Sequence, residues 1–152
     1  MQKDKIFIQI ASYRDPQLVP TIKDCISNAK WPENLHFCIA WQHTEDEKID
    51  EISCLPNVTI IDIPHLESKG ACWARNQIQQ RYNEEEYTLQ LDSHHRFAKD
   101  WDELVIGMYK NLQIKGYAKP LLTSYIPSFD PDNDPEARIQ DPWRMDFDRF
   151  IP

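Results

Sequence analysis

This 152-residue chain lacks several features that would mark a membrane, secreted or metal-ribbon protein. It has no apolar run near the roughly 20 residues that span a bilayer, so we expect no transmembrane segment. Its first five residues lead directly into a strand-like run and do not resemble a signal peptide, which makes the cytoplasm the default location. The cysteines form no C-x-x-C pair, which disfavours a zinc ribbon or a disulfide framework. We expect all four to be small buried residues: Cys25, Cys38, Cys54 and Cys72.

An excess of basic charge is also missing. The chain has 17 Lys and Arg against 25 Asp and Glu, a formal net charge of −8. A nucleic-acid-binding protein presents a basic face, so the sequence argues against a nucleic-acid partner. The 41% hydrophobic and 28% charged residues are typical of a globular protein, and the length suits one domain.

Short apolar segments rich in β-branched residues predict four strands, and their near-continuous apolar character predicts cover on both faces. They are residues 5–11, 35–41, 58–63 and 86–92, with residues 120–125 as a candidate fifth strand. Helical patterns fall between them at residues 45–53, 69–82 and 100–114. A further helix is expected from Pro16, capped by Asp15, with Pro20 delaying its regular part to residues 21–29. Such alternation predicts an α/β fold with a mainly parallel sheet flanked by helices.

The composition changes near residue 126. Residues 127–152 are acidic, aromatic and rich in proline, with little periodicity. We expect residues 1–126 to form one ligand-binding domain. Residues 127–152 are expected to begin a further region that binds a second substrate or a partner.

Ligands of parallel α/β sheets bind beyond the carboxyl ends of the strands, which here are followed by residues 12–15, 42–43 and 92–95. Strand alternation would place Asp92 and His94 on the same side of the chain. A carboxylate and an imidazole together suit a manganese-like divalent ion. For an isolated D-x-H motif, the alternative is that Asp92 caps a turn and His94 is a surface residue.

The residues before this motif favour the metal hypothesis. Gly70 opens a predicted helix that carries Arg75. A helix N-terminus and a guanidinium both attract phosphate, and here both precede the strand that ends at the D-x-H motif. Arg75 taken alone would be a surface arginine and Gly70 a turn residue. A zinc site of His94, His95 and His43 is a weaker alternative, because no H-x-x-x-H spacing or closing cysteine accompanies these histidines.

Four segments resemble the GlcNAc-transferase family, which includes polypeptide N-acetylglucosaminyltransferases. They are IFIQIASYRDPQLVPTIKDC, CIAWQH, KGACWARN and YTLQLDSHHRF. The resemblance spans roughly residues 5 to 126. It implies a GT-A fold (Rossmann-like, of the nucleotide-diphospho-sugar transferases), a UDP-sugar donor with UDP-GlcNAc first, and a glycan or protein acceptor.

The resemblance also implies roles for residues of this chain. A divalent ion, manganese or magnesium, would be held by Asp92 and His94, with Asp92 as the catalytic residue. The nucleotide-sugar site would be formed by Ser12, Tyr13, Arg14, Asp15, Gln42, Gly70, Arg75 and Asp92. Trp41-Gln42 stands where many GT-A enzymes have an aspartate that reads the base. Because the chain is short for a GT-A enzyme, a non-catalytic module that binds a nucleotide sugar or a partner is the competing hypothesis.

Overall fold

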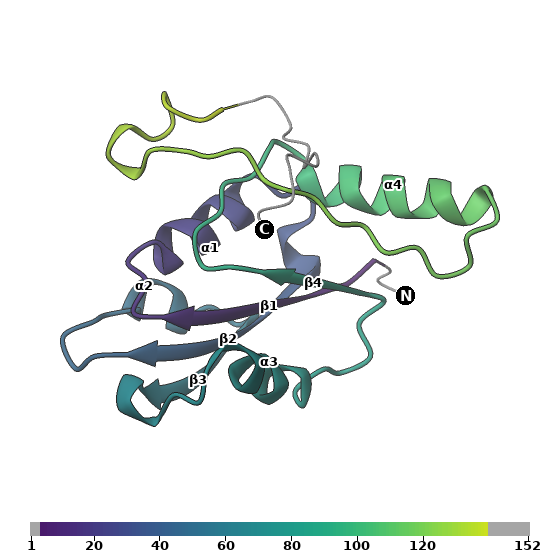
Figure 1. Ribbon diagram of the computed structural model, residues 1–152. Helices are drawn as coiled ribbons and strands as arrows, with labels where there is room; N and C mark the ends of the chain where they lie inside the picture. Colours follow the sequence, from purple (N-terminus) through teal and green to yellow (C-terminus); the bar gives the residue numbers. More distant parts are fainter. Residues whose placement is uncertain (1–3, 140–152) are drawn as a thin grey trace, which may run out of the picture. The chain divides into compact units, whose positions relative to one another are not determined.

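The computed structural model describes residues 4–139 and contains a four-stranded parallel sheet of order β3-β2-β1-β4 (Figure 1). All three strand pairings are parallel, which confirms the predicted α/β class and agrees with a GT-A fold. The four predicted strands are present with boundaries shifted by one or two residues: β1 Ile6–Tyr13, β2 Leu35–His43, β3 Val58–Pro64 and β4 Tyr87–Leu91.

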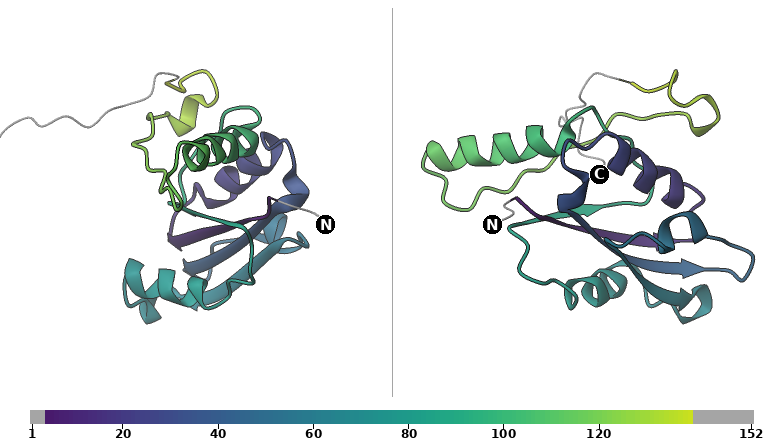
Figure 2. Two further views of the ribbon diagram at one scale, coloured as in Figure 1. Left: turned by 90° about the vertical axis from the view of Figure 1, so that its right-hand side faces the viewer. Right: turned by 180° about the vertical axis from the view of Figure 1, so that it is seen from behind.

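Both faces of the sheet are covered, as the apolar strands predict. Alternate residues of β1 and β2, such as Ile8 and Phe37, pack with Ile22 of α1 (Leu18–Ser27). On the opposite face, Phe7 and Cys38 pack with Ile78 of α3 (Ala71–Gln79). Figure 2 shows α1 and α3 on opposite sides of the strands. The central strands are therefore held between two apolar layers, and this fixes the loops at their carboxyl ends.

The helices differ in extent from the prediction. Helix α1 begins at Leu18, before Pro20, because a proline in the first turn occupies a position whose N–H has no helical partner. The predicted helix over residues 45–53 is reduced to α2 (Asp50–Ser53). In the preceding segment, the Glu47 carboxylate accepts from the Thr44 N–H and hydroxyl, which stabilises a turn in place of helix.

Two further expectations are wrong. Residues 120–125 form no strand and contribute only a bridge at Tyr125, because side chains such as Leu121 (89% exposed) are not buried there. Only two cysteines, Cys25 and Cys38, are buried. The exposed cysteines follow the last turn of α2 at Cys54 and lie in the first turn of α3 at Cys72.

The chain divides into two compact units, residues 1–106 and 107–152, so helix α4 (Trp101–Ile114) contributes to both. Short 3-10 helices lie at Pro32–Asn34, His65–Glu67 and Pro131–Asn133. Within the second unit, the Asp130 side chain caps the last of these. The end of the predicted tail, residues 140–152, lies outside the described part. No helix over residues 4–139 is long and apolar enough to cross a membrane.

Candidate functional site

The loops that follow β1 and β4 are joined through α1. The Thr21 hydroxyl donates to the Ser93 carbonyl at 2.9 Å and accepts from the His95 N–H at 3.0 Å. Thr21 is fully buried, so both hydrogen bonds are shielded from water. One side chain of α1 thus fixes the main chain on either side of His94.

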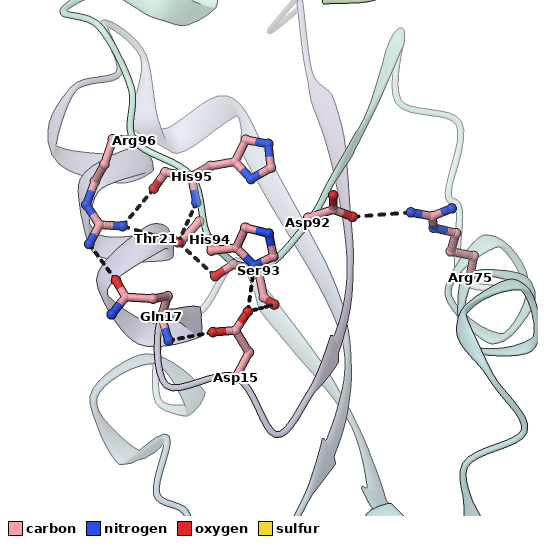
Figure 3. A network of polar contacts seen from close by, with 9 residues as sticks. All are labelled: Asp15, Gln17, Thr21, Arg75, Asp92, Ser93, His94, His95 and Arg96. Carbon is pink, nitrogen blue, oxygen red and sulfur yellow. Dashed lines mark hydrogen bonds and ion pairs between the residues drawn. The ribbon is translucent and has the colours of Figure 1, made fainter. Parts of the chain in front are cut away.

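Asp15 makes the second connection between these loops (Figure 3). One carboxylate oxygen accepts from the Ser93 hydroxyl at 2.6 Å and from His94 Nδ1 at 2.8 Å, and the other accepts from the Gln17 N–H at 2.8 Å. Burial opposes ionisation of Asp15, but the hydrogen bonds from His94 and Ser93 outweigh it and hold the pKa of Asp15 below its usual value. Asp15 is therefore a carboxylate at neutral pH.

Asp92 has a different partner. Its carboxylate lies 3.3 Å from Arg75 Nη2, and Figure 3 shows it pointing toward α3, away from Asp15. The Asp92 side chain is 60% exposed and that of His94 is 59% exposed. The structure thus brings Asp92 together with Arg75, and His94 together with Asp15. Within residues 4–139, no hydrogen bond or ion pair joins Asp92 to His94.

Gly70 lies at the start of α3 with a φ of +91°, a conformation that favours glycine. No side chain caps this helix end. The first N–H groups of α3 are therefore available to an anion, one turn from Arg75.

Gln42 does not present its amide to solvent. It is 2% exposed, its Nε2 donates to the Ser12 carbonyl at 3.0 Å, and its Oε1 accepts from the Ser68 hydroxyl at 2.6 Å. The amide links the end of β1 to the segment before α3. Ser12 is fully buried with an unpartnered hydroxyl, so Ser12 and Gln42 lie beneath the surface of this edge.

Tyr13 and Arg14 lie at the surface of the same edge. Tyr13 is 52% exposed. Arg14 has a φ of +50°, and its N–H donates to the Gln42 carbonyl at 2.8 Å, which holds this strained turn against β2. Tyr13 and Arg14 therefore present their side chains to solvent at this edge, as Asp92 does.

The sequence model of a glycosyltransferase (GlcNAc) family matches residues 5–55 and 50–152, which together cover nearly the whole chain. The chain belongs to this GlcNAc glycosyltransferase family. Membership implies transferase activity with a sugar donor and an acceptor. No curated protein and no solved structure matches the chain.

The residues of this glycosyltransferase can be tested for their fit to a divalent ion. The described residues contain no group of three or more His, Cys, Asp or Glu side chains placed to hold a metal. Two exposed side chains of the predicted metal-binding types are present, the Asp92 carboxylate and the His94 imidazole. A carboxylate accepts hydrogen bonds only, so His94 Nδ1 must carry the proton that Asp15 accepts. In the neutral imidazole, Nε2 then has a free electron pair, which suits an ion completed by substrate oxygens and water.

Two residues that stabilise this edge of the glycosyltransferase were not predicted, and the contact made by a third, Asp62, does not follow from its position at the end of β3 alone. Thr21 and Ser68 act through side-chain contacts to residues 72 and 26 positions away. Asp62, at the end of β3, accepts from His43 Nε2 at 3.0 Å, while the His43 ring stacks on Trp41 at 3.6 Å between centroids. No local pattern identifies such partners, because each depends on the order of strands in the sheet.

Proposed function

We propose that this glycosyltransferase binds a UDP-sugar, UDP-GlcNAc first, at the carboxyl edge of its sheet and transfers the sugar to a glycan or protein hydroxyl. The proposal includes a divalent ion, manganese or magnesium, held by Asp92 and His94. The observation that carries it is the 3.3 Å contact between Arg75 and Asp92, beside the uncapped start of α3. The contact supports the proposal because an arginine can bind the diphosphate of the donor, and this arginine lies next to a proposed metal ligand.

Charge explains why transfer would need this arrangement. Departure of the sugar leaves negative charge on the nucleoside diphosphate. When bound, a divalent ion supplies Lewis-acid stabilisation of that charge. Arg75 can donate two hydrogen bonds to phosphate oxygens, and the first N–H groups of α3 add the favourable end of the helix dipole. Such fixed donors stabilise a developing charge without reorganisation.

The remaining proposed residues shape the nucleotide site. Tyr13 and Arg14 are exposed at the end of β1 and can contact the uridine, while the buried Ser12 and Gln42 hold the backbone beneath them. Asp15 belongs to the same turn. Gly70, with its positive φ, directly precedes the first N–H groups of α3, which no side chain caps.

Substitution of Asp92 tests the proposal. Asp92→Asn removes a metal-binding charge with little change in shape, so manganese-dependent binding of UDP-GlcNAc should be lost in calorimetric titration. Asp50→Asn, which makes the same charge change in α2, should bind like the unaltered chain. An unchanged affinity of Asp92→Asn in manganese would contradict the metal assignment. Turnover of donor above that of Asp92→Asn would exclude the binding-only hypothesis.

A further inference from the structure

The His94 ring is held by Asp15, a residue far from it in the sequence. His94 is largely exposed, and such a ring would otherwise adopt several rotamers and either neutral tautomer. Its Nδ1 instead lies 2.8 Å from a carboxylate that comes from the loop after β1, 79 residues earlier in the chain. The Asp15 side chain is only 18% exposed.

The Asp15 carboxylate is already engaged by the protein. Ser93 and His94 donate to one oxygen and the Gln17 N–H donates to the other. These three contacts fix the plane of the carboxylate. The carboxylate is therefore directed toward the His94 ring and not toward a ligand in solution. Thr21 also holds the main chain on either side of His94, while the bond between His94 Nδ1 and Asp15 holds the ring.

We propose that Asp15 is a positioning residue: it fixes the tautomer and orientation of His94 and so leaves His94 Nε2 free to bind a divalent ion, while Asp15 itself would contact neither ion nor nucleotide. This inference rests on the proposed function, because it assigns His94 as a metal ligand. Carboxylate partners of metal-binding histidines hold the ring in this way, and their loss typically costs 10- to 100-fold in metal affinity.

Metal binding without donor measures this role apart from catalysis. Free Mn²⁺ is followed by electron paramagnetic resonance in titrations of the full chain and of its variants. Asp15→Ala should weaken Mn²⁺ binding by roughly 10- to 100-fold. Asp15→Asn, whose amide oxygen still accepts from Nδ1, should lose less. Asp62→Asn removes the same charge from the same sheet edge without contacting His94 and should bind Mn²⁺ like the unaltered chain.

The tautomer of His94 provides a readout that a general structural role would not change. In metal-free protein at about pH 8, where an ordinary imidazole is neutral, nitrogen NMR should show the proton on Nδ1. Asp15→Ala should move it to Nε2 in a large fraction of molecules, and Asp15→Asn should retain it on Nδ1. If Asp15→Ala does not fold, the Mn²⁺ affinity of Asp15→Asn relative to that of Asp62→Asn decides the question: a weaker affinity supports the role of Asp15 and an equal affinity contradicts it.

The outcomes separate this inference from the function on which it rests. Weakened Mn²⁺ binding in the Asp15 variants with a changed tautomer in Asp15→Ala supports the inference. Unchanged binding in these variants, with a clear loss in His94→Ala, overturns it and leaves the metal site intact. Absence of Mn²⁺ binding in the unaltered chain, with or without UDP, overturns the metal site and this inference together.

Discussion

Single residues at the carboxyl edge of the sheet combine in ways that their positions in the sequence do not show. Asp92 and His94 were expected on one side of a continuing strand, but β4 ends at Leu91, so alternation no longer governs the residues that follow. Asp92 then contacts Arg75, while Ser93 and His94 both contact Asp15. The residue types could be predicted from the motif, but their partners depend on three-dimensional packing.

Replacement of Arg75 should weaken binding of the sugar donor. Arg75→Ala should weaken UDP-GlcNAc binding by roughly tenfold to a hundredfold, because each hydrogen bond to a charged group contributes about 1.5–3 kcal/mol and a decade corresponds to about 1.4 kcal/mol. Calorimetric titration in manganese measures this loss. Arg81→Ala removes an arginine that follows α3 and donates to the Gln77 carbonyl, and should have little effect. Equal losses in both variants would show that overall charge, and not position, determines affinity.

His43 provides a pH-dependent prediction. Burial lowers its pKa, but the hydrogen bond to Asp62 and the other acceptors around the ring outweigh this, so the pKa of His43 is raised above its usual value. The contribution of this pair to stability is therefore complete below the unfolded-state pKa of about 6.5 and is lost as the pH rises through the folded-state pKa.

Asp62→Asn should lower the pKa of His43 in an NMR titration and reduce the fall in unfolding free energy across that pH window. Asp50→Asn makes the same charge change away from the ring and serves as control. A His43 pKa that is the same in Asp62→Asn as in the unaltered chain would contradict the assigned ion pair.

At the scale of elements, the strands could be predicted because their apolar character repeats over many residues. Helix boundaries were less predictable, since they depend on single contacts such as the turn between Thr44 and Glu47. The segment 120–125 has the composition of a strand, yet its side chains are exposed. Composition therefore indicates what a segment can form, while burial determines whether it does.

The start of α4 gives a stability prediction. Asp102 is 2% exposed, and its carboxylate accepts from the N–H groups of Lys30 and Trp31 in the loop between α1 and β2. Asp102→Ala leaves both donors without this acceptor and should lower the free energy of unfolding by about 3 kcal/mol. Glu103→Ala removes only an exposed ion pair with Lys30, which solvent screens, and should lower the free energy of unfolding much less.

Chemical denaturation of the two variants measures the difference. A loss in Asp102→Ala no larger than that in Glu103→Ala would contradict the role assigned to Asp102 as the acceptor that fixes this loop.

At the scale of the whole molecule, a parallel sheet brings loops distant in sequence to one edge. The turn after β1, the start of α3 and the turn after β4 contain all the exposed residues of the proposed donor site. The family and the α/β fold could be predicted from four sequence segments. The division of the chain into two compact units after Ile106 could not be predicted, because it falls within helix α4 and no change of composition marks it.

The central claim is that this edge binds a nucleotide sugar with a divalent ion. Calorimetric titration of UDP-GlcNAc into the protein, with and without manganese, tests it most directly. We predict saturable binding that requires manganese and is competed by UDP. Absence of binding under both conditions, or equal binding with and without manganese, would contradict it.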